Sequence, residues 1–225
     1  MIKIKPIALI LTAIFSSSVL ANNCIDSKDS FDDYDDTVKQ ASVRDLPTEY
    51  YVLSYSWAPR HCEKASDADK RPGGEDYLQC NSGRNFGYIL HGLWPQGRID
   101  NPHKYPTGYP RACEGEQPKI AKSVLQKYLC MTPSVSLLQH EYEYHGTCMH
   151  DESLETPQAY FDTALRLHQS NTFPEQQIFA SDKSVEWLVK HNPHLTADAI
   201  LYDNYSQEWR ICYDSNFAVM SCPLK

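Results

Sequence analysis

Residues 140–148 read HEYEYHGTC and hold two histidines, two glutamates and a cysteine in less than three helical turns. Such a stretch can be a metal site, a catalytic site, or one end of a disulfide with charged neighbours. A zinc-binding helix needs two histidines four residues apart, so that both project from one face. His140 and His145 are five apart, about 140° around a helix. We therefore expect no metal site here.

Glu141 and His145 have the four-residue spacing that places two side chains on one helix face. A carboxylate beside an imidazole orients the ring, and the helix end before Gly146 favours its protonated form. This arrangement suits an acid–base histidine. An ordinary surface ion pair has the same spacing, so a second observation is needed.

The remaining pattern predicts an α+β fold, with a central antiparallel sheet flanked by several helices, because strands and helices do not alternate regularly. No repeat or linker divides the chain, so residues 22–225 should form one domain, with a loosely held arm at 22–46. A long surface loop is expected at 97–118. The expected strands are 49–57, 86–95 (broken by Gly92 and Pro95), 208–214 and 218–223. The expected helices begin at Pro118, at Ser136 (with Gln139 as a capping box), at Pro157 after a Thr156 cap, and at Ser184.

The N-terminus has the features of a secretory signal peptide. Two lysines precede an apolar run, and small residues follow at the right offsets for cleavage after Ala21. The protein should therefore be exported, to the periplasm if the host is Gram-negative. No later stretch approaches the roughly 18 apolar residues of a membrane span, so we expect no membrane contact after cleavage. We also expect a monomer. Beyond residue 21, 19 basic and 29 acidic residues leave a net charge of −10, which excludes a general coating by nucleic acid.

The mature chain holds an even number of cysteines, which in an exported protein predicts four disulfides. None shows the two-residue spacing of a zinc knuckle. Proximity favours two pairs, Cys62 with Cys80 and Cys212 with Cys222, and leaves the other four open. The eight cysteines are Cys24, Cys62, Cys80, Cys113, Cys130, Cys148, Cys212 and Cys222.

A second histidine, His91, stands where an apolar and aromatic strand meets Gly92. A histidine at that point can line a cleft, or can be a core histidine bonded to backbone. Two histidines and a carboxylate suit cleavage of RNA through its own 2′-hydroxyl, because the substrate carries its nucleophile. Such a reaction requires no metal, no cofactor and no serine or cysteine nucleophile.

Together, HGLWPQ at 91–96 and HEYEYHGTC at 140–148 resemble the two active-site segments of the ribonuclease T2 family, whose usual forms are near HGLWP and HEWxKHGTC. These are secreted, disulfide-bonded endoribonucleases with little base specificity. Their order, their spacing of about fifty residues, the signal peptide and the cysteines all agree. The resemblance implies a single-stranded RNA substrate, cyclic-phosphate intermediates and 3′-phosphate ends.

The resemblance also implies a role for each matching residue. His145 corresponds to the general base and His91 to the general acid, although the pair is better fixed than the order of the two roles. Glu141 corresponds to the carboxylate at the scissile phosphate, and His140 to an auxiliary phosphate ligand. Trp94 corresponds to an aromatic near a base site; the other interpretation is a core tryptophan. Cys148 corresponds to a disulfide cysteine, with Cys113 as the preferred partner.

One position departs from the family pattern. Tyr144 stands where a lysine usually precedes the second histidine. A tyrosine donates one hydrogen bond but no charge, so it offers less stabilisation to a developing anion. Arg84, Arg98 and Lys104 flank the first segment and are candidate replacements. The departure also keeps a second hypothesis open, a slow or inactive ribonuclease fold that binds RNA, a nucleotide or a partner.

Overall fold

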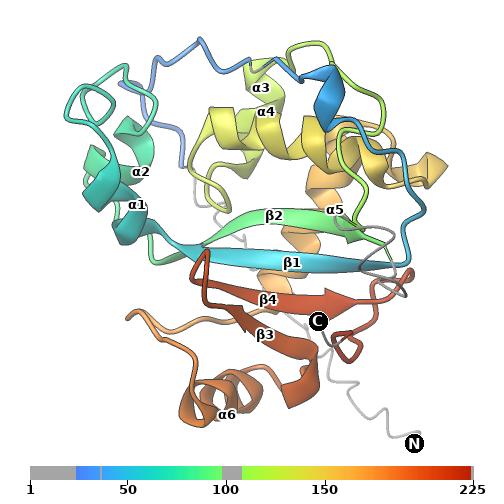
Figure 1. The fold of residues 1–225 in the computed structure, drawn as a ribbon. Coiled ribbons are helices and arrows are strands. Elements are labelled where there is room, and N and C mark those ends of the chain that lie inside the picture. The colour runs from blue at the N-terminus through green and yellow to red at the C-terminus, as the bar shows by residue number, and fades with distance from the viewer. Residues whose placement is uncertain (1–23, 36, 98–107, 224–225) are drawn as a thin grey trace, which may run out of the picture.

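A computed structural model describes residues 24–35, 37–97 and 108–223 (Figure 1). Four strands form one antiparallel sheet in the order β2-β1-β4-β3. They are β1 (Tyr50–Trp57), β2 (Tyr88–Gln96), β3 (Ile200–Asp203) and β4 (Glu208–Tyr213). The α+β fold with a central antiparallel sheet is therefore confirmed. The expected signal peptide lies outside the described residues.

Helices surround this sheet on several sides (Figure 1). The helices α3 and α4 lie along the β2 edge, α1 and α2 lie at one end, and α6 lies beyond β3. Their bounds are α1 Ala58–Lys64, α2 Tyr77–Asn81, α3 Lys122–Leu125, α4 Val135–Tyr144, α5 Pro157–Ser170 and α6 Asp182–His191. Short 3₁₀ turns occupy Gln40–Ser42, Gln126–Tyr128, Gly146–Cys148, Glu152–Leu154 and Ala197–Ala199.

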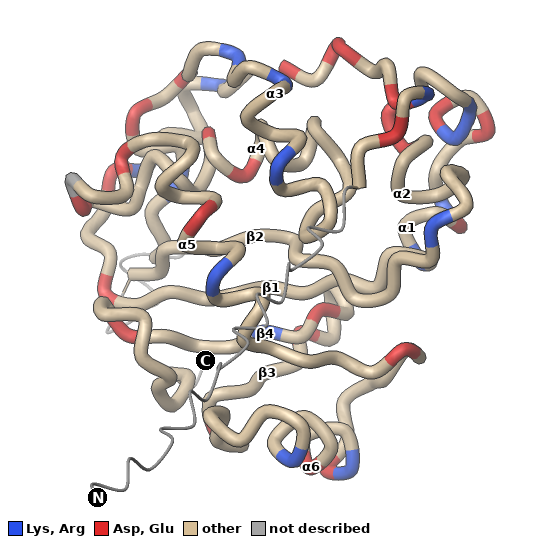
Figure 2. Tube along the Cα trace, turned by 180° about the vertical axis from the view of Figure 1, so that it is seen from behind, with Lys and Arg blue, Asp and Glu red and all other residues tan. Residues whose placement is uncertain are grey.

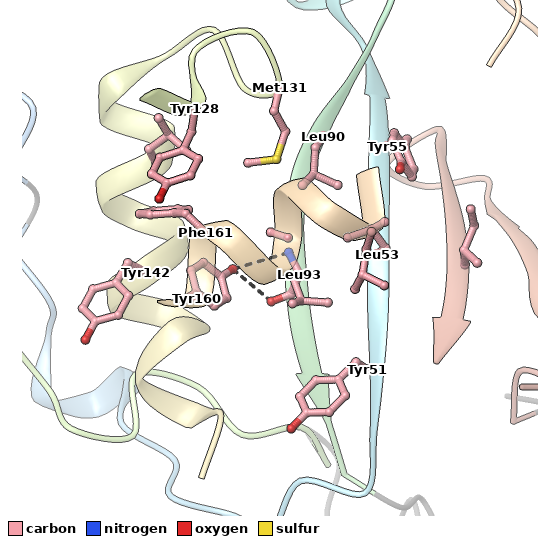
Figure 3. Packing of buried hydrophobic residues seen from close by; sticks show 14 of the residues in the cluster. Tyr51, Leu53, Tyr55, Leu90, Leu93, Tyr128, Met131, Tyr142, Tyr160 and Phe161 are labelled. Atoms are coloured by element: carbon pink, nitrogen blue, oxygen red, sulfur yellow. Dashed lines mark hydrogen bonds between the residues drawn. The ribbon is translucent and has the colours of Figure 1, made fainter. Parts of the chain in front are cut away.

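The main core lies between the sheet and the helices α4 and α5 (Figure 3). Leu53 of β1 and Leu93 of β2 are fully buried against the aromatic rings of α5. The hydroxyl of Tyr160 donates to the carbonyl of Leu93 at 3.0 Å and accepts from its N–H at 3.4 Å. Burial of an aromatic side chain usually needs such a partner for its polar end, and this one fixes α5 to the centre of β2.

Strand β2 does not break at Gly92, as the sequence led us to expect, but continues to Gln96. The register passes from Ser54 opposite Gly92 to Tyr55 opposite Leu90, so His91 is the extra residue of a β-bulge. A bulge redirects a side chain without ending the strand. Pro95 is tolerated because β2 is an edge strand, where a missing N–H need not interrupt pairing on both sides.

The helix expected from Pro118 begins only at Lys122 and gives way to a 3₁₀ turn after four residues. The chain before it is committed to other bonds: the N–H of Ile120 donates to the Gln139 side chain at 2.9 Å, and its carbonyl accepts from Tyr34 at 2.9 Å. Tyr34 is buried in the core. The described part of the arm, residues 24–35 and 37–46, is therefore held more firmly than expected.

The cap of helix α4 lies two residues earlier than the Ser136 cap that the sequence suggested. Ser134 is the cap, and its hydroxyl accepts the N–H of Leu137 at 3.1 Å. The helix ends at Tyr144, before Gly146, and a 3₁₀ turn follows. Helix α5 has the expected Thr156 cap, whose hydroxyl accepts from the N–H of Ala159.

The C-terminal region contains one of the two expected strands. β4 is present, but residues 218–223 make only an isolated bridge, between Val219 and Tyr213. The antiparallel partner of β4 is instead β3, which the sequence analysis missed. The short helices α1 and α2, which the Cys62–Cys80 disulfide joins, were also missed.

Four disulfides join the structure, including the two favoured by proximity and the Cys113–Cys148 pair implied by the resemblance. The fourth joins Cys24 of the arm to Cys130. Among the described residues, no helix is both long and apolar enough to cross a membrane. Lys and Arg positions are interspersed with Asp and Glu along the described trace (Figure 2).

Candidate active site

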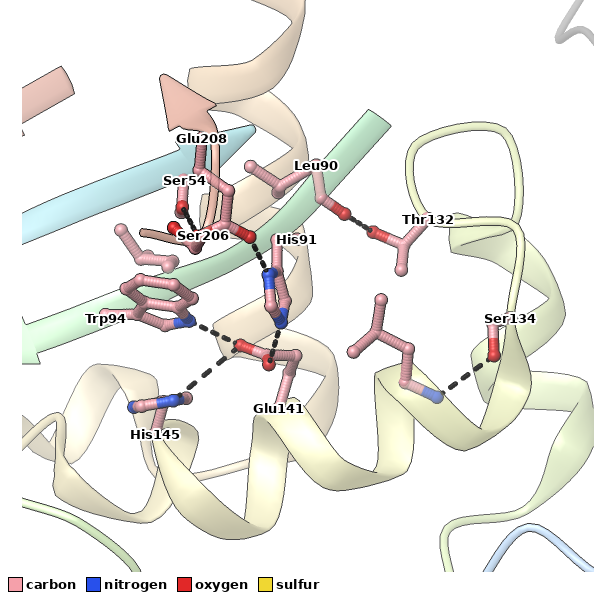
Figure 4. A network of polar contacts seen from close by, with 12 residues as sticks. Ser54, Leu90, His91, Trp94, Thr132, Ser134, Glu141, His145, Ser206 and Glu208 are labelled. Carbon is pink, nitrogen blue, oxygen red and sulfur yellow. Dashed lines mark hydrogen bonds and ion pairs between the residues drawn. The ribbon is translucent and has the colours of Figure 1, made fainter. Parts of the chain in front are cut away.

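Figure 4 shows the polar cluster that forms where α4 passes the edge strand β2. The bulge turns His91 toward α4, and its side chain remains one-third exposed (32%). Its Nε2 lies 3.4 Å from Oε1 of Glu141. Its Nδ1 makes a short hydrogen bond to Oε1 of Glu208. His91 is thus held between two carboxylates from different elements.

Glu141 is almost completely buried, and ring nitrogens of three side chains lie around its carboxylate (Figure 4). The indole N–H of Trp94 donates to Oε2 at 2.7 Å, and Nε2 of His145 lies 4.0 Å from the same oxygen. Burial alone would raise the pKa of Glu141, but the charges of His145 and His91 outweigh it and lower the pKa to about 2. Glu141 is therefore a carboxylate at neutral pH.

Gly92 permits this close approach of helix and strand. A Cβ at this position would lie 1.8 Å from Oε2 of Glu141 and 2.6 Å from Nε1 of Trp94. Both distances are far shorter than a non-bonded contact allows. The glycine after His91 is required because the carboxylate occupies the space of a side chain.

The two histidines differ in charge at neutral pH. Burial alone would lower the pKa of His91, but Glu141 and Glu208 raise it to about 10. Burial lowers the pKa of His145 to about 4, against the opposing effect of Glu141, and the charge of Arg111 adds to the lowering. His91 is therefore an imidazolium, while His145 is a neutral imidazole whose Nδ1 has no hydrogen-bond partner.

Glu208 was not anticipated from the sequence. It opens β4 and is buried, and its second oxygen accepts from Ser54 at 3.2 Å. Despite burial, the contact with His91 lowers the pKa of Glu208. The one available signal was an acidic residue at the start of an expected strand, which by itself points to no partner.

Trp94 lies among the charged groups of the cluster. Its ring centroid lies 5.4 Å from that of His145 and 5.0 Å from that of His91. The guanidinium carbon of Arg210 lies 5.1 Å from the indole centroid. The indole therefore lies beside both histidines and anchors Glu141. Its expected contact with a base stays a prediction.

His140 and Tyr144 lie on another face of α4, and their rings stack at 4.2 Å. The guanidinium carbon of Arg111 lies 4.1 Å from the Tyr144 ring centroid. Of the cations suggested from sequence, Arg84 contacts the carbonyl of Ile25, and Arg98 and Lys104 lie outside the described residues. Arg111 was missed, because a loop residue without periodicity gives no signal of its position.

A cleft of about 820 Å³ opens beside the cluster and is lined by His91, His140 and Glu208. Its lining also includes Arg60 and Tyr205, of which Tyr205 is 97% exposed. His145 is buried and does not line this cleft. His91 therefore connects the open cleft with the buried Glu141–His145 pair.

Two groups of three potential metal ligands occur among the described residues, and neither includes His91 or His145. Their ligand atoms lie within 4.8 Å of one another. The groups are Asp35 with Glu116 and Glu143, and Asp45 with Cys113 and His150. In the second group Cys113 is committed to a disulfide.

Comparison with known proteins finds relatives that are described as ribonucleases. A family model described as the Ribonuclease T2 family matches residues 48–188. A "Probable ribonuclease" of Haemophilus influenzae is 32% identical over 211 residues, which is 92% of this chain and 74% of the relative. A "Ribonuclease" of Aeromonas hydrophila is 38% identical over 101 residues, 44% of this chain and 37% of the relative.

Among solved structures, trichomaglin, described as a novel S-like ribonuclease, matches with a TM-score of 0.54 at 16% identity over 79% of this chain and 92% of its own. At that identity the match concerns the fold alone. The family model, in contrast, spans both histidine segments, and the Haemophilus relative aligns over nearly the whole chain. On these grounds this chain belongs to the ribonuclease T2 family of endoribonucleases.

Proposed function

We propose that this endoribonuclease cleaves single-stranded RNA by metal-independent transphosphorylation, with His145 as general base and His91 as general acid. One observation carries the proposal: both histidines contact the same buried carboxylate, Glu141, yet their pKa values are displaced in opposite directions. Two titratable groups whose environments separate their pKa values are the usual basis of acid and base assignments.

In the first step, substrate binding exposes His145, which is buried in the free protein. Neutral His145 then takes the proton of the 2′-hydroxyl, and the 2′-oxygen attacks phosphorus. The bond to the 5′-oxygen breaks, and Nε2 of His91 gives its proton to that departing oxygen. The products are a 2′,3′-cyclic phosphate and a new 5′-hydroxyl end. A bound phosphodiester anion raises the pKa of His145, which makes it a stronger base than in the free protein.

In the second step, the roles reverse. His91, now neutral, accepts a proton from water, and the resulting attack opens the cyclic phosphate. The protonated His145 returns its proton to the 2′-oxygen, leaving a 3′-phosphate. Glu141 stays ionised throughout and balances the positive charge as it passes from one ring to the other. Both histidines are thereby restored for another cycle.

Cleavage of a dinucleoside phosphate by the purified mature protein, in the presence of a chelator, tests the mechanism. We expect a cyclic phosphate followed by a slower 3′-phosphate, and loss of both products in His91→Ala and in His145→Ala. Wild-type turnover in both variants would refute the assignment of the residues. Activity that requires an added divalent cation would refute the metal-independent route.

A second candidate function is favoured by Tyr144, because its stacked ring supplies no charge where the family usually has lysine. In that case the fold would bind RNA or a nucleotide with little turnover. The same assay separates the two, because a binding module would retain the dinucleotide uncleaved, with an affinity that His145→Ala leaves unchanged.

We further propose that the protein is exported after cleavage behind Ala21. Four disulfides among the described cysteines suit an oxidising compartment. N-terminal sequencing of the protein recovered from a periplasmic or culture-medium fraction should begin at Asn22. Recovery of the full-length chain from the cytosol would contradict this proposal.

A further inference from the structure

Three neighbouring strands meet at the ring of His91 (Figure 4). Ser54 of β1 lies opposite Gly92 of β2 on one side and opposite Arg210 of β4 on the other. This register brings the start of β4 under the bulge, so that Glu208 reaches Nδ1 of His91 across 117 positions of sequence. The contact depends on the sheet and on no local motif.

Glu208 is held firmly in that position. Its Oε2 accepts from the fully buried Ser54 hydroxyl at 3.2 Å and lies 3.6 Å from Nη2 of Arg210. Arg210 is in turn fixed by Asp203 at 2.9 Å. A buried carboxylate with partners on both oxygens has little freedom to rotate. Its hydrogen bond to His91 therefore fixes the orientation of the imidazole.

We propose that Glu208 is the positioning residue of His91: by accepting the Nδ1 proton, it directs Nε2 toward the substrate in both chemical steps. This inference rests on the proposed role of His91 as general acid. When Nε2 gives its proton to the 5′-oxygen, the other proton stays on Nδ1, still bonded to Glu208. Neutral His91 is thus left as the Nδ1–H tautomer. Its bare Nε2 is then ready to accept a proton from water.

Glu141 does not supply the same constraint. It faces Nε2, the nitrogen that must reach the substrate, and its other oxygen is bonded to Trp94. Among the residues that the structure describes, Glu208 alone holds the nitrogen that does not react. A partner on the far side of a histidine commonly sets the tautomer in this way.

Wild-type protein offers the direct test, by ¹⁵N NMR of the His91 ring across its titration. The titratable and charged groups around His91 are Glu141 from α4, His145 just after it, Glu208 from β4 with Arg210 behind it, and His61 from α1. We expect both ring nitrogens to be protonated at neutral pH and Nδ1 alone to be protonated above the titration. A neutral ring protonated at Nε2 would overturn the inference.

Glu208→Gln provides the kinetic test, since the amide keeps the shape but removes the charge and can force the other tautomer. We expect kcat to fall about 10- to 100-fold, as for other residues that orient a functional histidine, with KM nearly unchanged. The alkaline limb of the pH profile should move to lower pH. An unchanged kcat and limb in the folded variant would overturn the inference.

Ser54→Ala is the matched control, because it removes a partner of Glu208 but leaves the charge beside His91. Its alkaline limb should stay in place. Should Glu208→Gln fail to fold, Glu208→Asp substitutes for it. The charge remains, but the shorter side chain no longer reaches Nδ1, so kcat should fall while the limb moves less than in Glu208→Gln. Wild-type kcat in Glu208→Asp would refute positioning. An active His91→Ala would instead refute the proposed function itself.

Discussion

The guanidinium carbon of Arg111 lies 4.1 Å from the ring centroid of Tyr144, whose ring stacks on His140. The residue that departs from the family pattern therefore supports a cation that comes from another segment. A guanidinium over an aromatic face keeps its charge and is partly desolvated. That charge also acts on His145, where it contributes to the lowered pKa.

Replacement of Arg111 by Met should move the acidic limb of the pH profile to higher pH. The substitution removes one cause of the low pKa of His145, so the base loses its proton only at higher pH. We also expect kcat/KM at neutral pH to fall about tenfold, or about 1.4 kcal/mol. Arg111→Lys, which keeps the charge, should leave the limb in place. Tyr144→Phe, which keeps the ring, should have a kcat/KM within about twofold of the wild-type value. An unmoved limb in Arg111→Met would contradict this account.

Gly92→Ala should remove activity while the sheet remains intact. The added methyl group would collide with Oε2 of Glu141 and displace it from Trp94 and His91. We expect a loss of about 100-fold in kcat/KM and about 1–3 kcal/mol in the free energy of unfolding. Both are measured on the purified variant, by dinucleotide cleavage and by urea unfolding.

Gly87→Ala is the control for that substitution. Its methyl group would meet only the Trp57 ring, at 3.4 Å, an ordinary contact. Activity should therefore stay close to wild type, with unfolding free energy changed by less than about 0.5 kcal/mol. Equal losses in the two variants would mean that the chain resists an added methyl group both before and within β2, and that Glu141 is not the reason for Gly92.

The parts of the fold that the sequence could predict are those specified by neighbouring residues. Strand β1 follows from its run of aromatic and β-branched side chains, and α5 from Thr156, Pro157 and the apolar face behind them. The start of α3 could not be predicted in this way. There the backbone of Ile120 bonds to a side chain of α4, a choice that depends on tertiary packing.

The residues of the site fall into the same two groups, those that a local motif reveals and those that long-range packing brings in. His91, Glu141 and His145 lie in two short motifs, and the four-residue spacing of the last two places them on one helix face. Glu208 joins them only through the register of three strands. Arg111 joins through a loop whose residues follow no period. Long-range pairing is set by the whole core, so no local pattern could reveal either residue.

The dependence of kcat/KM on pH should be a broad plateau with two limbs. His145 must be neutral to act as base, so activity rises as pH increases through about 4. His91 must be protonated to act as acid, so activity falls as pH increases through about 10. Initial rates on a dinucleoside phosphate measure both limbs, provided that the protein remains folded. A single limb near the pKa of a free histidine would mean that the two carboxylates do not control His91.

Removal of Cys24–Cys130 should cost more stability than removal of Cys212–Cys222. The first disulfide joins residues 106 apart in sequence and the second residues 10 apart. In the chain-entropy description, closing these loops contributes about 4–5 and about 3 kcal/mol, respectively, to the free energy of unfolding. Urea unfolding of the two double alanine variants measures the difference, and the reverse order would show that strain or residual structure dominates.

The arm that Cys24 anchors also places Asp33, Tyr34 and Asp35 in the wall of the cleft. Cys24→Ala/Cys130→Ala should therefore also raise KM, while Cys212→Ala/Cys222→Ala should not.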